Sequence, residues 1–319
     1  SRFIMKKVKN SLSFVFPGQG SQKVGMLREF GAEQTVGVTF SEASEVLGYD
    51  IWNLIQEGDP SAINLTVRTQ PILLCCSFAL WRLWVARGGK TPDYLAGHSL
   101  GEWSALVCAG VISFRDALII VEERGALMQS AVPEGCGAMA AVIGLNDESV
   151  MECCEQARII GEVAAVNFNA PGQIVIAGDS KGVNKAIALC KRAGAKRSIL
   201  LPVSAPFHTP MMRSAAERLS QRLKDIIFCY PKIPVIHNVH GSFEEDPESI
   251  KAAVLKQIYN PVLWVKCIQG LRNQGTNMFV ECGPGGVLSG LMRRIDKSIK
   301  AHTLHTIETF ESAITAVSE

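Results

Sequence analysis

Aromatic residues and net charge are both scarce in this sequence. Phe, Trp and Tyr make up 7% of the residues, and 32 Lys and Arg face 30 Asp and Glu, a formal net charge of +2. Bulk nucleic-acid binding needs a basic surface, and base stacking needs aromatic platforms. The composition argues against nucleic acid as a partner, although a near-neutral net charge is compatible with a local basic patch.

Long apolar runs are absent as well. The best run, residues 71–81, is interrupted by Arg82. It therefore falls short of the roughly 20 residues that a membrane-spanning helix needs. We predict no membrane-spanning segment.

The ten cysteines include no C-x-x-C pair. Most of them lie inside apolar runs, which is typical of buried free thiols in a reducing compartment. His237 and His240, in the β-like run 233–241, are a pair with ligand-like spacing. We interpret this pair as structural and predict no metal site.

Hydrophobic residues, in contrast, are abundant and make up 47% of the 319 residues. This is enough for one large domain with an inserted piece, or for two ordinary domains, and it excludes disorder. The sequence starts at Ser1, and its first ten residues include basic but no acidic side chains. Such a start is typical either of the end of a targeting presequence or of a solvated terminus.

Strand-like and helix-like patterns alternate along the chain, which predicts an α/β fold. Residues 12–16 and 94–96 are expected strands, and residues 71–87 and 102–109 are expected helices. The core is expected to contain a parallel sheet.

The stretch 133–203 follows a different order. Its expected elements are strands at 138–144, 163–168, 173–177 and 198–203, with helices at 147–157 and 181–192. The order βαββαβ is that of a ferredoxin-like unit. We predict a small ferredoxin-like subdomain at 133–203, inserted into a large catalytic subdomain formed by residues 1–132 and 204–319.

The strongest chemical signal is the G-x-S-x-G motif at residues 97–101, between an expected strand and an expected helix. A nucleophilic serine on such a turn faces outward at a helix N-terminus, where N–H groups favour negative charge. A chance match on a tight turn is the alternative. In this context the motif predicts Ser99 as a nucleophile, on an α/β-hydrolase-like core with a parallel sheet.

A serine nucleophile needs a base, and the chain offers six histidines. His98 adjoins Ser99, so its side chain cannot easily turn back to it, and we interpret it as structural. His208 lies in a loop bounded by Pro206 and Pro210, directly after an expected strand. Rigid loops at strand ends are where α/β folds hold such groups, which puts His208 modestly ahead of the others.

Seven short motifs occur along the chain, at residues 16–22 (FPGQGSQ), 69–71 (TQP), 97–102 (GHSLGE), 135–140 (GCGAMA), 203–208 (VSAPFH), 257–261 (QIYNP) and 281–285 (ECGPG). Over residues 12–296 the sequence resembles the malonyl-CoA:acyl-carrier-protein transacylases of fatty-acid and polyketide synthesis. Its length resembles that of the discrete type II enzyme. The cysteine content and the basic start resemble the mitochondrial form, which implies the mitochondrial matrix after removal of a presequence; the cytoplasm is the alternative.

The resemblance implies catalytic roles. Ser99 would be the nucleophile and His208 its general base, forming a Ser-His dyad. The backbone carbonyl of Gln257, rather than an acid, would orient the base. The oxyanion hole would consist of the N–H groups of Gln19 and Leu100.

The resemblance also implies binding roles. Arg124 would hold the malonyl carboxylate, although a lone helical arginine otherwise suggests a surface salt bridge. The pocket would be lined by Phe207, Met128 and Gln70. An equally good interpretation of Met128 is that it packs in the core. The bulk of Phe207 favours malonyl over methylmalonyl.

Both CoA and acyl carrier protein are acidic, so basic surface is expected near the cleft. Lys196 and Arg197 are the first candidates, against an ordinary solvated face. The next are Lys191, Arg192, Arg293 and Arg294.

The implied reaction is a ping-pong transfer of malonyl from malonyl-CoA to the phosphopantetheine of acyl carrier protein. No bound cofactor and a monomer are expected. Two alternatives share parts of the pattern: a serine thioesterase or esterase, and a non-catalytic scaffold that binds carrier protein. The thioesterase would normally show an acid partner and has no need of Arg124.

Overall fold

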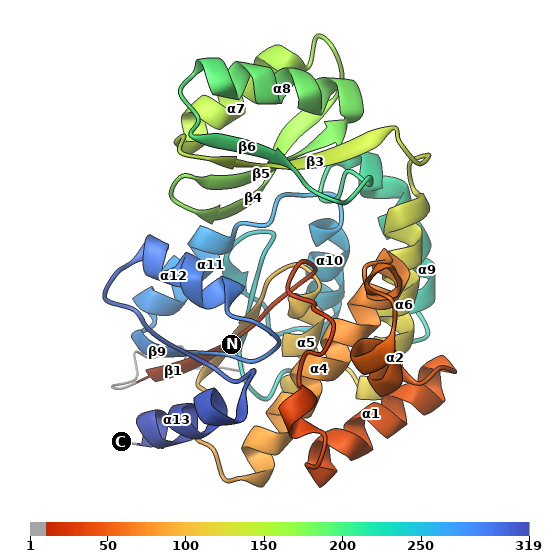
Figure 1. Ribbon diagram of the computed structural model, residues 1–319, viewed down its shortest axis with the longest axis vertical. Coiled ribbons are helices and arrows are strands. Elements are labelled where there is room, and N and C mark those ends of the chain that lie inside the picture. The colour runs from red at the N-terminus through yellow and green to blue at the C-terminus, as the bar shows by residue number, and fades with distance from the viewer. Residues whose placement is uncertain (1–10, 319) are drawn as a thin grey trace.

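The computed structural model describes residues 11–318 and contains two β-sheets (Figure 1). The basic start of the chain lies outside the described residues. The larger sheet has six strands in the order β10-β9-β1-β2-β7-β8, all parallel except β8. Its strands are β1 (Ser11–Phe16), β2 (Tyr94–Gly97), β7 (Val235–His237), β8 (Ser242–Phe243), β9 (Thr276–Glu281) and β10 (Lys300–Thr303). The predicted α/β core with a parallel sheet is confirmed.

Helices cover both faces of this sheet, so the strands at its centre are buried on both sides. Every residue of β1 is buried, and Phe14 makes edge contacts with Trp81 and Trp84, with ring centroids 5.4 and 5.1 Å apart. The helices around the sheet are α1 (Gln34–Leu47), α2 (Ile51–Glu57), α3 (Pro60–Ile63), α4 (Thr66–Ala86), α5 (Gly101–Cys108), α6 (Phe114–Ser130), α9 (Arg213–Leu223), α10 (Pro247–Gln257), α11 (Trp264–Asn273), α12 (Val287–Ile295) and α13 (Ile307–Ser318), with 3₁₀ turns η1 (Arg28–Phe30) and η2 (Pro210–Met212).

The second sheet belongs to the ferredoxin-like unit. This unit contains β3 (Gly137–Ile143), α7 (Asp147–Ala157), β4 (Val163–Ala170), β5 (Gln173–Asp179), α8 (Ser180–Arg192) and β6 (Arg197–Leu200). The strand order is β4-β5-β3-β6 with every pair antiparallel, which confirms the βαββαβ prediction. Figure 1 shows α7 and α8 on the face of this sheet turned away from the large subdomain. The domain limits at 133 and 203 stay a prediction.

Two element boundaries differ by three residues or more from those expected. The helix predicted at 71–87 already begins at Thr66, with Pro71 inside it. This extension makes α4 long and apolar enough to cross a membrane by length and composition, but 72% of that window is buried inside the protein, as in a core helix. The strand predicted at 198–203 ends at Leu200, because Pro202 has no N–H to continue the ladder.

Helices α4 and α6 approach closely beside the site because Gly125 has no side chain. A Cβ at this position would lie 2.6 Å from the carbonyl oxygen of Thr66 and 3.0 Å from the Cα of Val67. Glycine at this point of α6 therefore sets the spacing between the two helices.

We predict opposite effects for two helical glycines. Gly125→Ala forces the helices apart and should lower the free energy of unfolding by about 1–3 kcal/mol. Gly290→Ala in α12 is the matched control: nothing lies within 4 Å of its Cβ position, so helix propensity alone should stabilise the protein by up to about 1 kcal/mol. Urea unfolding of both variants checks this; effects of the same sign would contradict it.

Candidate active site

Ser99 sits on a strained turn between β2 and α5. Its φ is 52°, in the left-handed region that costs a residue with a side chain about 1–3 kcal/mol. The flanking glycines make the turn possible. A Cβ on Gly97 would lie 1.9 Å from the oxygen of Gly101, and a Cβ on Gly101 would lie 2.1 Å from the oxygen of Phe16.

His208 lies against the serine. Its Nε2 is 2.8 Å from Ser99 Oγ, and its Nδ1 is 2.7 Å from the carbonyl oxygen of Gln257. A carbonyl can only accept, so Nδ1 carries the proton and Nε2 has the free lone pair that faces the serine hydroxyl. His208 is itself held in a left-handed conformation, with φ 65°. The structure thus brings together the predicted nucleophile, the base and its orienting carbonyl.

The surroundings keep the imidazole neutral. Burial, followed by the positive charge of Arg124, lowers the pKa of His208 to about 3. At neutral pH the ring is therefore a proton acceptor.

Arg124 projects from α6 and is 1% exposed. Its two terminal nitrogens each donate a 2.8 Å hydrogen bond, one to Gln70 Oε1 and one to Gln257 Oε1, while Nε has no partner. Burial lowers the pKa of Arg124 to about 10, and the charge of Glu102 opposes this, so the guanidinium is charged at neutral pH. Within residues 11–318 it forms no ion pair, which leaves its charge available to a carboxylate ligand.

One cavity of about 90 Å³ holds these groups. It is lined by eight residues predicted from the sequence: Gln19, Gln70, Ser99, Leu100, Arg124, Met128, Phe207 and His208. Five more complete it, namely His98, Met139, Asn167, Leu201 and Val203. Gln257 is fully buried behind this lining.

The backbone N–H groups of Gln19 and Leu100 flank the serine from two loops. In the described part of the chain neither donates a hydrogen bond. The loops can meet because a Cβ on Gly18 would lie 2.4 Å from the oxygen of His98. The pair is thus available to an anionic oxygen in the cavity.

Lys196 and Arg197 do not reach this cavity. Arg197 begins β6 and pairs with Ile143, whereas the cavity lies beside Met139, four residues back along β3. At about 3.3 Å per residue this separates them by about 13 Å along the strand. Both lie at the outer end of the small sheet.

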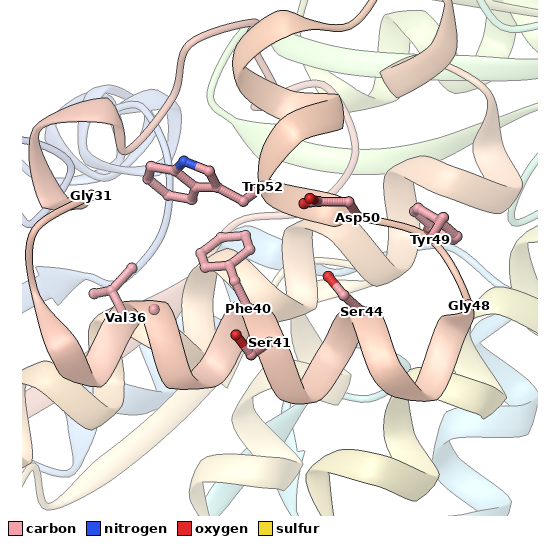
Figure 2. A pocket seen from close by; sticks show the side chains of 10 residues that line it. Gly31, Val36, Phe40, Ser41, Ser44, Gly48, Tyr49, Asp50 and Trp52 are labelled. Atoms are coloured by element: carbon pink, nitrogen blue, oxygen red, sulfur yellow. The ribbon is translucent and has the colours of Figure 1, made fainter.

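A larger cavity of about 590 Å³ lies between α1 and α2 (Figure 2). Apolar side chains from both helices, including Phe40 and Trp52, line it together with Ser41, Ser44 and Asp50. It contains neither Ser99 nor His208, so it is not the site of the serine chemistry.

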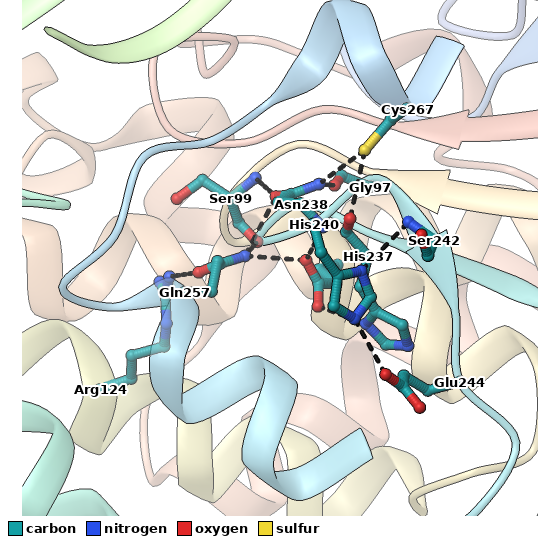
Figure 3. Close-up of polar contacts among 11 residues, drawn as sticks. Gly97, Ser99, Arg124, His237, Asn238, His240, Ser242, Glu244, Gln257 and Cys267 are labelled. Carbon is teal, nitrogen blue, oxygen red and sulfur yellow. Dashed lines mark hydrogen bonds and ion pairs between the residues drawn. The ribbon is translucent and has the colours of Figure 1, made fainter. Parts of the chain in front are cut away.

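Three buried polar residues lie behind the serine: Glu102, His237 and Asn238. Figure 3 shows His237 and Asn238. Glu102 and Asn238 were not assigned a role from the sequence, whereas His237 was interpreted as structural. The Glu102 carboxylate accepts from His237 Nδ1 at 2.7 Å and from the N–H of Asn238 at 3.1 Å. The sequence signals for this cluster are the acid in the GHSLGE motif and the spacing of His237 and His240. The two histidines of the His237–His240 pair contact different acids: His237 contacts Glu102, and His240 contacts Glu244 at 2.9 Å.

Comparison with known proteins agrees with this geometry. Residues 13–309 match the family model of the acyl transferase domain. The chain belongs to the acyl transferase family. It is 50% identical to a malonyl CoA-acyl carrier protein transacylase of Salmonella typhimurium over 304 residues, covering 95% of this chain and 98% of the relative. The corresponding Escherichia coli protein is also 50% identical, with the same coverage.

Solved structures show the same relationship. An acyl carrier protein S-malonyltransferase of Vibrio cholerae superposes with a TM-score of 0.92 at 50% identity, covering 95% of this chain and 99% of that chain. A malonyl-transacylase in complex with a type II polyketide synthase acyl carrier protein gives 0.94 at 47% identity, covering 96% and 99%. The family resemblance predicted from the motifs is therefore confirmed. The relatives from Salmonella typhimurium, Escherichia coli and Vibrio cholerae are bacterial.

The low pKa of His208 predicts a specific acid sensitivity. The unfolded chain, with a histidine pKa near 6.5, binds a proton between pH 7 and pH 5 that the folded acyl transferase does not bind. Stability therefore falls as the pH falls, and this group contributes about 2 kcal/mol of that loss. In His208→Gln the loss between pH 7 and pH 5 should be smaller by about that amount. Urea unfolding at both pH values checks this, and identical losses in the two proteins would contradict it.

Proposed function

We propose that this chain transfers malonyl from malonyl-CoA to the phosphopantetheine thiol of acyl carrier protein through a malonyl ester of Ser99. The observation that carries the proposal is the 2.8 Å contact between Ser99 and neutral His208 in one cavity with the buried cation Arg124. The reaction supplies extender units for fatty-acid synthesis. No resident cofactor takes part.

The first half-reaction loads the enzyme. Ser99 Oγ attacks the thioester carbonyl of malonyl-CoA while its proton passes to His208 Nε2. The resulting oxyanion lies between the N–H groups of Gln19 and Leu100, and losing one such donor typically costs roughly 10²–10³ in rate. The C–S bond then breaks, and the imidazolium of His208 protonates the departing CoA thiolate.

The second half-reaction unloads it. The phosphopantetheine thiol gives its proton to His208, and its sulfur forms a bond to the malonyl carbonyl carbon. The C–O bond to Ser99 breaks, and the proton on His208 returns to the serine oxygen. The enzyme is thereby restored, and each half-reaction uses the same base.

Arg124 selects the acyl group. Malonyl differs from acetyl by a free carboxylate, which a guanidinium can hold with two parallel hydrogen bonds. Gln70 and Gln257 hold the guanidinium in the cavity wall. Phe207 lines the same cavity next to the base and leaves less room for a branched acyl group.

Formation of a covalent ester is the first prediction of this mechanism. Intact mass after mixing with malonyl-CoA should show a single malonyl adduct, absent in Ser99→Ala and discharged by carrier protein that bears phosphopantetheine. Release of free malonate with unloaded carrier would instead indicate a thioesterase. No adduct and no turnover would indicate a scaffold that binds carrier protein.

Removal of the cation is the second. Arg124→Ala should lower kcat/KM for malonyl transfer by about 100-fold or more, the order expected for a lost charge-assisted hydrogen-bond pair. Acetyl transfer does not use the cation, so it should change far less. Steady-state assays with both acyl-CoAs measure the ratio, and equal losses would contradict the carboxylate clamp.

Lys196 and Arg197 support carrier binding only as part of an outer basic surface, since they lie away from the cavity. An acidic carrier can contact such a surface while its extended phosphopantetheine reaches Ser99. The mitochondrial matrix and the monomeric state stay predictions. The ten cysteines are free thiols, which fits a reducing compartment.

A further inference from the structure

One side chain, that of Asn238, bonds the turn that carries Ser99 at two points. Asn238 follows directly after β7, the strand next to β2 in the sheet, and it is fully buried. Figure 3 shows its amide lying against the turn between Gly97 and Ser99. Asn238 does not line the cavity, so its side chain does not contact a substrate bound there.

The amide contacts the turn on both sides of His98. Its Nδ2 donates to the carbonyl oxygen of Gly97 at 2.8 Å, and its Oδ1 accepts from the N–H of Ser99 at 2.9 Å. The orientation of the amide is fixed, because a flipped amide would place its NH₂ against the N–H of Ser99 and its oxygen against the Gly97 carbonyl.

Asn238 is in turn held by two neighbours. Its own N–H donates to the Glu102 carboxylate at 3.1 Å. Its Oδ1 also accepts from Gln257 Nε2 at 3.1 Å, and the same Nε2 donates to the carbonyl oxygen of Ser99 at 2.9 Å. The amide and carbonyl of Ser99 are therefore both bonded to side chains from other parts of the chain.

These contacts decide which N–H faces the cavity. The N–H of Ser99 is used by Asn238, whereas that of Leu100 donates to no acceptor among the described residues. We propose that Asn238 is a positioning residue of the transferase, whose amide clamps the left-handed turn so that Ser99 Oγ and the Leu100 N–H both face the acyl carbonyl. The inference rests on the proposed role of Ser99.

The clamp bonds the turn of the nucleophile directly and is linked to the carboxylate anchor only through Gln257. Without Asn238, Gln257 keeps its bonds to Ser99, Glu102 and Arg124, which gives the clamp a signature of its own. In Asn238→Ala, kcat should fall about 100-fold for malonyl and acetyl transfer alike, as expected for a misplacement of about 1 Å. The KM for malonyl-CoA should stay within about threefold, since Arg124 is unaltered. Sulfonylation of Ser99 by phenylmethanesulfonyl fluoride, a neutral reagent without a carboxylate, should slow in parallel.

A matched control separates positioning from general loss of stability. Thr276→Val removes a buried hydroxyl that bonds Ser13 at 2.8 Å, at the opposite end of the same sheet. It should lower Tm with kcat and the sulfonylation rate unchanged. If Asn238→Ala merely reduces the fraction of titratable Ser99, with a wild-type rate for the remainder, its role is structural and the inference is overturned.

Asn238→Asp decides the matter should the alanine variant not fold. It keeps an acceptor for the Ser99 N–H but places a carboxylate oxygen against the Gly97 carbonyl, so acetyl transfer and sulfonylation should still slow at least tenfold. Wild-type rates in either folded variant overturn the inference. Ser99→Ala and Arg124→Ala are measured alongside the Asn238 variants. A malonyl adduct that persists in Ser99→Ala refutes the proposed nucleophile. Loss of the adduct in Ser99→Ala, together with wild-type rates in the Asn238 variants, refutes only the clamp.

Discussion

The hydrogen bonds of Gln257 are the constraint on which the rest of the site depends. Its backbone carbonyl holds the imidazole of His208, its amide oxygen holds Arg124, and its amide nitrogen holds the carbonyl of Ser99. One residue at the end of α10 thus sets the base, the anchor and the nucleophile relative to each other. A carboxylate in its place would add a charge beside Arg124, so a neutral amide leaves that cation available to the substrate.

Burial explains why the site needs this support. Arg124 and His208 share a small cavity, and desolvation disfavours the charged form of each. The arginine stays charged because its ordinary pKa is so high, and its charge then helps to keep the histidine neutral. The same two groups therefore provide one cation for a carboxylate and one neutral base for a hydroxyl at a single pH.

The sequence predicted those parts of the site that local chemistry dictates. The glycines around Ser99 indicated a sharp turn, and the βαββαβ order indicated the small sheet. Asn238 could not be found in this way, because it is 139 residues from Ser99 along the chain and only the pairing of β2 with β7 brings it near. The sequence places the start of α4 at Pro71, because proline favours the first turn of a helix. Tertiary packing extends the helix past this proline to Thr66.

Backbone strain is concentrated where the chemistry is. Apart from Leu27, the residues with side chains and positive φ in the described chain are Ser99 and His208, the two that exchange the proton. Such conformations persist only where surrounding structure holds them. Asn238 and Gln257 hold Ser99. The C-terminal end of α10 holds His208, whose N–H donates to the carbonyl oxygen of Ile258. Because both supports meet at Gln257, the distance between the reacting atoms is set by the fold before any substrate enters.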